Sequence, residues 1–310
     1  MTDRPLTKNS PGRNVSDPLV SVIIPHYNDL ANLRRCLGRL ASQTLPKDRF
    51  EIVVADNGSA CGLEEVQNVC GRIARVVHAP IPGAGPARNV AVAASSGAVL
   101  AFTDSDCRPA PDWLENGLAA LRNADIVGGR VDVDVGDPAH PTAIEAFELV
   151  FAFNVKRYIA ELGFSVSANI FVSRATFDRV GAFRARVVED LDWGTRASAA
   201  NCRWRYAPDV VVSHPARRTW AELWKKWRRR TAEDFALANE RRYGKAIWFL
   251  RSFAILLSPF VHWLAVLRSD KLAGAEQRLS AIAVLFRIRF RRFIECNRLL
   301  VQKTFFGLHP

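Results

Sequence analysis

Two carboxylates, Asp104 and Asp106, lie just after the apolar run 98–102. Because side chains alternate along an extended strand, two acids separated by one residue project to the same side. Adjacent carboxylates repel each other unless a cation lies between them, and their oxygens are suitable ligands for Mg²⁺ or Mn²⁺. A divalent ion held here could neutralise a diphosphate. The same D-x-D pattern also occurs in solvated turns, so the prediction depends on the residues that the fold brings close.

The elements around this pair alternate between strands and helices, which predicts an α/β fold with a Rossmann-like, doubly wound and mainly parallel sheet. In such a sheet the carboxyl ends of the strands border the crevice where ligands bind. The pattern predicts strands at 20–25, 51–56, 75–78, 98–103, 126–135, 168–173 and 204–213. Helices are expected at 30–40, 63–69 and 87–95, from 111, and from a capping box at Thr142 and Glu145 towards residue 160.

The positive charge of the chain is confined to its C-terminal third. The 310 residues carry a formal net charge of +12, but residues 217–310 hold 20 Lys and Arg against 7 Asp and Glu. The six cysteines form no C-x-x-C pair, which argues against structural zinc and a disulfide framework and favours a reducing compartment. Residues 1–17 are polar and lack the apolar segment of a secretory signal, so we expect a disordered tail and a cytoplasmic location.

Six motifs occur in a characteristic order between residues 20 and 214. The set resembles the GT-A nucleotide-sugar glycosyltransferases, and specifically the large inverting family 2. Each motif is common, whereas the ordered set is specific. The motifs are VIIPHYN at 22–28, VVADNGS at 53–59, GPARN at 85–89, FTDSD at 102–106, SAN at 167–169 and ED at 189–190.

The resemblance implies a nucleotide pocket at the ends of the first two strands. It assigns Asp56 to the base or ribose, because a carboxylate accepts hydrogen bonds from N–H and O–H groups. Pro25, Tyr27 and Asn28 would line the same pocket. Asp56 could instead close an Asx turn, and Asn28 could instead cap the following helix.

Arg88 follows the glycine-rich segment 83–86, where missing side chains permit close approach of a ligand. Its guanidinium could pair bidentately with phosphate, although a surface arginine in the first helical turn is the alternative. A dinucleotide fingerprint requires a third glycine at this position, and Arg88 occupies it. The sequence therefore excludes a Rossmann dinucleotide site in this loop.

The resemblance also implies the residues for metal binding and catalysis. Asp104 and Asp106 would hold Mg²⁺ or Mn²⁺, with Asp106 as the better direct ligand. His214 could complete the metal sphere, where imidazole suits Mn²⁺ better than Mg²⁺, or it could be a loop residue. Asp190 would be the base that takes the proton of the acceptor hydroxyl. Its alternative is an acidic first helical turn, and Asp192 could be confused with it.

Two further residues are assigned to the acceptor side. The resemblance implies that Glu189 and Asn169 border the acceptor, whereas Asn169 could simply cap the end of a strand. A nucleotidyltransferase on a similar sheet is a rival, but it would place G-x-G-x-R after the first strand. A non-catalytic membrane adaptor is a second rival, and we would expect it to have lost Asp104, Asp106 or Asp190.

The C-terminal third predicts contact with a membrane. Trp220, Trp224 and Trp227 recur at helical spacing with basic flanks, which is typical of a helix lying in an anionic membrane surface. The apolar run 246–267 contains Pro259 and favours a re-entrant or interfacial hairpin over a full span. The basic C-terminal third contains no nucleic-acid recognition motif, which argues against nucleic-acid binding. A soluble helical cap is the alternative.

Together these features predict a disordered tail at 1–17, a GT-A domain at 18–216 and a helical, basic, membrane-associating extension at 217–310. The resemblance implies a non-processive, inverting glycosyltransferase that uses a nucleotide-sugar donor. The membrane association suggests a lipid-linked saccharide acceptor, polysaccharide or glycolipid assembly, and a location at the cytoplasmic face of the plasma membrane.

Overall fold

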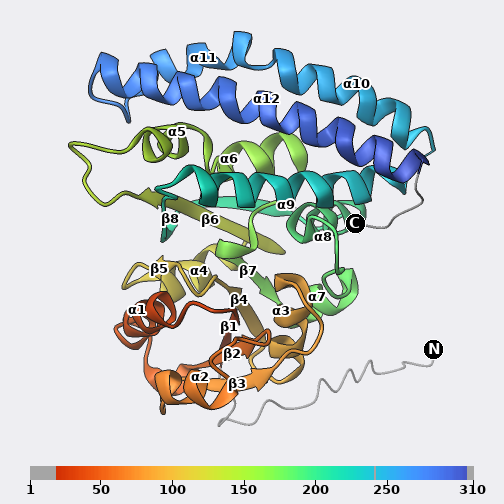
Figure 1. Cartoon of the computed structure of the whole chain (residues 1–310). Coiled ribbons are helices and arrows are strands. Elements are labelled where there is room, and N and C mark those ends of the chain that lie inside the picture. Colours follow the sequence, from red (N-terminus) through yellow and green to blue (C-terminus); the bar gives the residue numbers. More distant parts are fainter. Residues whose placement is uncertain (1–18, 241, 306–310) are drawn as a thin grey trace, which may run out of the picture.

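The computed structural model describes residues 19–240 and 242–305, so the predicted tail at 1–17 lies outside the described residues. One eight-stranded sheet forms the centre, in the order β3-β2-β1-β4-β7-β6-β8-β5. Figure 1 shows this sheet beneath a layer of long C-terminal helices. The strands are β1 Val20–His26, β2 Phe50–Asp56, β3 Arg75–His78, β4 Val99–Phe102, β5 Arg108–Pro109, β6 Ile126–Asp134, β7 Ile170–Ser173 and β8 Trp204–Pro215.

The sheet is mixed: four of its seven strand pairs are parallel, in line with the expected mainly parallel sheet, and three are antiparallel. β1, β2, β3 and β4 pair in parallel, as does β6 with β8. β7 lies between β4 and β6 and is antiparallel to both, and β5 is antiparallel to β8. The alternation of strands and helices predicts that successive strands run parallel. β7 instead pairs with β4, which is distant in the sequence, and runs antiparallel to it. The parallel half carries the residues before the aspartate pair.

Two apolar layers cover the faces of the sheet. Buried side chains of α1, α2 and α4 pack on one face, and those of α3, α7 and α8 pack on the other. All six cysteines are free, in agreement with the absence of a disulfide framework. These helices are α1 Leu30–Ala41, α2 Leu63–Cys70, α3 Ala84–Ala93, α4 Trp113–Leu121, α7 Arg174–Val180 and α8 Glu189–Ala199.

The predicted capping box is confirmed at the start of α5, Ala143–Phe151. The Thr142 hydroxyl accepts a hydrogen bond from the Glu145 amide, and the Glu145 carboxylate accepts one from the Thr142 amide. The helix ends earlier than the expected residue 160. The Asn154 side chain caps a new short helix, α6 Val155–Arg157, which continues into a π-helical turn at Tyr158–Leu162.

Four helices follow β8: α9 Trp220–Asn239, α10 Gly244–Leu257, α11 Pro259–Leu267 and α12 Ala275–Phe305. The apolar run 246–267 forms α10 and α11, which are bent by 42° at their junction, a geometry that fits either a broken span or a re-entrant segment. No single described helix is long and apolar enough to cross a membrane, although the bent α10–α11 pair passes that test by length and composition. α12 packs against α5, α9, α10 and α11, and Figure 1 shows α10–α12 outside α9.

The tryptophan face of α9 does not face outwards, which corrects the prediction that this helix lies in a membrane. Trp220, Trp224 and Trp227 pack with the apolar cluster shared by α5, α11 and α12. Arginines of α12 lie over these rings, because guanidinium groups stack favourably on aromatic faces. The guanidinium carbons of Arg287, Arg291 and Arg292 lie 4.0, 5.6 and 4.2 Å from the ring centroids of Trp220, Trp224 and Trp227, respectively.

Candidate active site

Asp104 and Asp106 lie in the loop between β4 and β5, where the parallel half of the sheet ends. Ligand atoms of Asp104, Asp106 and Cys107 lie within 4.8 Å of one another. The Oδ1 atom of Asp106 is buried and has no hydrogen-bond partner among the described residues. Its Oδ2 atom lies 3.3 Å from Nε2 of His214, at the end of β8. The fold thus brings His214, which lies far from the aspartate pair in the sequence, next to Asp106.

The electrostatics of this cluster fit a hard divalent cation. Burial raises the pKa of Asp106, His214 lowers it, and the neighbouring charge of Asp104 raises it further. Burial also raises the pKa of the Cys107 thiol well above its ordinary value, so the thiol stays protonated and is a poor ligand. The two carboxylates therefore remain as donors, with the imidazole of His214 beside Asp106, and such groups suit Mg²⁺ or Mn²⁺.

His214 is held with one ring nitrogen towards Asp106. Its Nδ1 atom lies 2.8 Å from the carbonyl oxygen of Pro215, so a proton on Nδ1 donates to that oxygen and leaves Nε2 free to accept or ligate. The ring of Phe153 lies 5.1 Å from the imidazole. This contact and the Pro215 bond together fix the orientation of the ring.

A buried carboxylate holds two cations near the same cluster. Glu148 of α5 is 2% exposed and lies 3.1 Å from Arg217 and 2.9 Å from Lys226. The charge of Arg217 reaches Asp106, whose pKa it lowers. The sequence interpretation missed Glu148, Arg217 and Lys226. The available signal was Glu148 among the apolar residues 146–151, because an acid in an apolar stretch predicts a buried ion pair.

Arg88 in the first half of α3 bridges two acidic groups instead of projecting as a surface arginine. It is 2% exposed, with Nη2 2.5 Å from Asp104 Oδ1 and Nη1 3.2 Å from Glu189 Oε1. Burial alone would lower the pKa of Arg88, but Asp104 and Glu189 raise it overall. Arg88 therefore connects the aspartate pair of the β4–β5 loop with the acidic start of α8.

Asp190 lies at the start of α8 and carries a perturbed carboxylate. Burial and the neighbouring Glu189 raise its pKa to about 6, against the opposing effect of Arg88. The Ser167 amide donates a 3.0 Å hydrogen bond to its Oδ1 atom. A carboxylate that ionises near neutral pH is suited to accept a proton.

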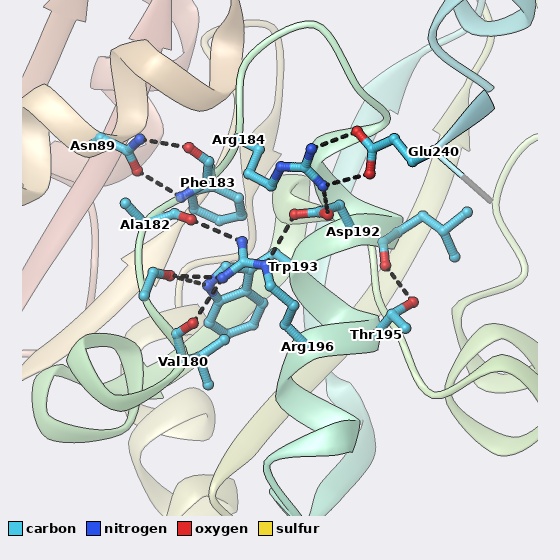
Figure 2. A network of polar contacts seen from close by, with 12 residues as sticks. Asn89, Val180, Ala182, Phe183, Arg184, Asp192, Trp193, Thr195, Arg196 and Glu240 are labelled. Carbon is cyan, nitrogen blue, oxygen red and sulfur yellow. Dashed lines mark hydrogen bonds and ion pairs between the residues drawn. The ribbon is translucent and has the colours of Figure 1, made fainter. Parts of the chain in front are cut away.

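Asp192 differs from Asp190 because its oxygens are committed to ion pairs. Figure 2 shows Asp192 between Arg184 and Arg196, at 2.9 and 3.0 Å. Arg184 also lies 2.5 Å from Glu240, next to the end of α9. These pairs fix α8 relative to α9.

The loop before α8 is tied to α3 beside Arg88. Asn89 donates to the Phe183 carbonyl at 2.8 Å and accepts from the Phe183 amide at 2.9 Å, as Figure 2 shows. Gly85 allows this close packing, because a Cβ atom there would lie 3.2 Å from the Arg184 carbonyl and 3.3 Å from Glu189 Cβ. The glycine-rich segment thus brings α3 against the start of α8.

The residues assigned to the nucleotide pocket lie at the ends of β1 and β2. Asp56 is buried and accepts hydrogen bonds from the Ser59 hydroxyl at 2.6 Å and the Ser59 amide at 3.1 Å. His26, a residue that the sequence interpretation did not single out, lies 3.1 Å from the same carboxylate. Although burial opposes it, this bonding holds the pKa of Asp56 below its usual value. The observed turn matches the Asx alternative and leaves part of the carboxylate's accepting capacity unused.

Asn28 is not the cap of α1. Asp29 caps the helix by accepting from the Asn32 amide at 3.2 Å. Asn28 instead adopts a φ of 54°, a left-handed conformation that asparagine tolerates, and its Oδ1 accepts from the Ala60 amide at 2.7 Å. Pro25 lies buried in β1, whereas Tyr27 is 61% exposed.

Asn169 lies in a 3₁₀ turn before β7 and is fully buried. Its Oδ1 accepts from the Trp113 indole at 2.9 Å, and its amide nitrogen donates to the carbonyls of Arg130 and Val210 at 2.8 and 2.9 Å. Gly129 makes room for it, since a Cβ there would lie 2.3 Å from the Asn169 amide nitrogen. All its side-chain polar atoms are bonded within the protein, so Asn169 joins β6 and β8 to the turn before β7.

Known structures share this fold. Mannosyltransferase PcManGT from Pyrobaculum calidifontis, in complex with GDP-Man and Mn²⁺, aligns with a TM-score of 0.57 and 19% identity over 94% of this chain and 88% of its own. Staphylococcus aureus TarS 1–349, in complex with UDP-GlcNAc, aligns with a TM-score of 0.51 and 18% identity over 93% and 92%. Both likenesses support a glycosyltransferase fold of the GT-A type.

Sequence similarity identifies the family. The model of glycosyl transferase family 2 matches residues 21–190. Glycosyltransferase AglE of Haloferax volcanii is 33% identical over 76% of this chain and 81% of its own length. Pre-mycofactocin glycosyltransferase of Mycobacterium tuberculosis is 29% identical over 64% of this chain, which spans 43% of that relative. Since the model covers more than half of the sequence and AglE matches most of it, the chain is a glycosyltransferase and belongs to glycosyl transferase family 2.

Proposed function

We propose that this enzyme is an inverting, metal-dependent glycosyltransferase that moves a sugar from a nucleotide-sugar to a lipid-linked saccharide at a membrane surface. The observation that carries the proposal is the convergence of Asp104, Asp106 and His214 with the desolvated carboxylate Asp190. Arg88 and Glu189 connect the two parts. PcManGT, which shares the fold, was solved with GDP-Man and Mn²⁺, and this supports a nucleotide-sugar and a divalent ion here.

The donor side is assigned to the ends of β1, β2 and β4. Asp104, Asp106 and His214 would hold Mg²⁺ or Mn²⁺, which when bound supplies positive charge to the diphosphate leaving group. Arg88 orients Asp104 through their 2.5 Å contact. The nucleotide is assigned to a pocket lined by Pro25, Tyr27, Asn28 and Asp56.

The acceptor side is assigned to the start of α8. The ionised Asp190 carboxylate takes the proton of the acceptor hydroxyl while that oxygen attacks the anomeric carbon. A new bond forms between the acceptor oxygen and the anomeric carbon, the bond from that carbon to the diphosphate oxygen breaks, and the configuration inverts. Glu189 borders this position and keeps its orientation through the 3.2 Å contact with Arg88.

The membrane contact is assigned to the outer faces of α10 and α11 instead of the tryptophan face of α9. Leu250, Phe260 and Val261 are 69%, 66% and 67% exposed on these helices. Lys245 and Arg268 are exposed at the outer ends of the same pair. An apolar surface with basic neighbours fits an anionic leaflet, so we place the enzyme on the cytoplasmic face of the plasma membrane, in polysaccharide or glycolipid assembly.

A donor panel tests the catalytic part of the proposal. The purified chain is incubated with individual nucleotide-sugars and Mg²⁺ or Mn²⁺, and slow hydrolysis and transfer are measured with and without EDTA. We expect one donor to turn over only with metal, and Asp106→Asn to lose at least 100-fold, on the order of a removed catalytic group. The matched control is Asp132→Asn, a half-exposed acid on β6. Turnover that survives both EDTA and Asp106→Asn would contradict the proposal.

A flotation assay tests the membrane part independently. The chain should float with anionic vesicles, and the double variant Leu250→Asp/Val261→Asp should remain in solution because two exposed apolar contacts are lost. Ile73→Asp is the control, since Ile73 is 47% exposed but lies just after α2, outside the C-terminal helices. Equal flotation of the double variant and the control would refute the assignment of this surface.

A further inference from the structure

Three buried nitrogen atoms in the C-terminal helices have no hydrogen-bond partner among the described residues. They are Nε1 of Trp227 in α9, Nδ1 of His262 in α11 and Nε of Arg289 in α12. Buried N–H groups are nearly always bonded, because an unpaired one costs the full desolvation penalty. Three such atoms on three packed helices therefore indicate a missing acceptor.

Arg289 is the charged member of this group, and it forms no ion pair with any residue of the described chain. Its guanidinium carbon lies 5.8 Å from the Trp227 ring centroid, and burial alone lowers its pKa. The neighbouring Arg292 differs, because it lies 3.7 Å from the buried carboxylate of Asp234. A desolvated cation without a counter-charge is costly, so the Arg289 position favours an anionic ligand.

The surroundings add positive charge and N–H groups rather than acids. Burial, and then the charges of Arg289 and Arg157, lower the pKa of His262. Arg292 also lies over Trp227, with its guanidinium carbon 4.2 Å from the ring centroid. An indole N–H, a guanidinium and, in the tautomer protonated at Nδ1, an imidazole N–H match the several acceptor oxygens of a phosphate group.

The position of His262 indicates what is attached to that phosphate. Its neighbours in α11, Val261 and Trp263, are 67% and 40% exposed, and Phe260 is 66% exposed. A group bonded between α11 and α12 therefore lies directly beneath the exposed apolar surface. A hydrocarbon chain on the phosphate could continue onto that surface, whereas a free phosphate ion would make no use of it.

We propose that Trp227, His262 and Arg289 form a binding site for the phosphate of a lipid with a hydrocarbon chain, such as the carrier of the saccharide acceptor. This inference deepens the proposed function and rests on it for the identity of the lipid as the acceptor carrier. The site itself is defined by the three unpartnered nitrogen atoms. Trp227 directly follows Lys226, whose contact with Glu148 connects α9 to α5.

Binding without any nucleotide-sugar tests the site. The full chain, in an uncharged detergent, is titrated with farnesyl phosphate, farnesol and inorganic phosphate by calorimetry and tryptophan fluorescence. We expect farnesyl phosphate to bind at least tenfold more tightly than either of the others. Arg289→Gln should weaken farnesyl phosphate about ten- to hundredfold, as expected for one charge-assisted hydrogen bond. His262→Leu should weaken it less.

The control is Arg291→Gln, an exposed arginine of the same helix that lies over Trp224 and should leave binding unchanged. Equal affinity for farnesol and farnesyl phosphate would overturn the phosphate site, and equal affinity for inorganic phosphate would overturn its assignment to a lipid. Equal losses in Arg289→Gln and Arg291→Gln would also contradict it. Binding of farnesyl phosphate by a chain that transfers no sugar would refute the proposed function and leave the site intact.

Discussion

The pH dependence of sugar transfer tests the role of Asp190. Only the ionised carboxylate can accept the acceptor proton, and burial beside Glu189 raises its pKa to about 6. Lowering the pH through this value protonates the base and removes activity. From the titration of a single group, the ionised fraction falls from about 0.9 at pH 7 to about 0.1 at pH 5, so kcat/KM should fall about tenfold over this interval.

The assay is the initial rate of transfer between pH 5 and 8 at saturating divalent ion, with nucleoside diphosphate affinity measured at each pH. Glu189→Gln removes the neighbouring negative charge and should move the acidic limb to lower pH. Glu233→Gln is the matched control, because burial raises the pKa of Glu233 to about 7 and this carboxyl also senses Glu189. A rate that is flat from pH 7 to 5, or an acidic limb abolished by Glu233→Gln, would refute the assignment of Asp190.

Three other predictions concern the metal, a buried ion pair and a strand link. EDTA and Asp104→Asn should each weaken nucleotide-sugar binding at least tenfold, measured by calorimetry, because a charge that neutralises diphosphate is lost; unchanged affinity would contradict this. Glu148→Leu should lower the free energy of unfolding by about 3 kcal/mol in urea titrations, since Arg217 and Lys226 would be left without their carboxylate; a stability gain would show that the pair is not worth its desolvation. Asn169→Ala should cost about 3 kcal/mol, as three buried hydrogen bonds are lost, and a loss below about 0.5 kcal/mol would show that the neighbouring groups find other partners.

Much of the local structure could be predicted from the sequence. The β-branched runs form strands because such residues fit a pleated, buried surface, and the Thr142 box begins α5 through two local hydrogen bonds. The expected proximity of His214 to the aspartate pair is found, at 3.3 Å from Asp106. These features depend on contacts between residues that are close in the sequence, or on an ordered set of motifs that is typical of one fold.

The predictions that failed concern contacts between residues that lie far apart in the chain. The spacing of Trp220 and Trp224 correctly indicated an apolar helical face, but it could not show that α12, more than 50 residues later, covers that face. The pattern of apolar and polar side chains likewise could not show that β7 pairs with β4 in antiparallel orientation. The bridge from Arg88 to Glu189 joins residues 101 positions apart and became visible only when α3 and α8 were placed together.

The ion pair between Arg184 and Glu240 has a consequence for how the two halves of the molecule move. α9 is a continuous helix of 20 residues, so it shifts as one stiff rod about 30 Å long. Lys226 fixes its first half to α5, and Glu240, which follows its last residue, is connected through Arg184 to Asp192 of α8. Any displacement of α9 is therefore transmitted to α5 and to α8 together, which couples the position of Asp190 to that of the carboxylate that holds Arg217.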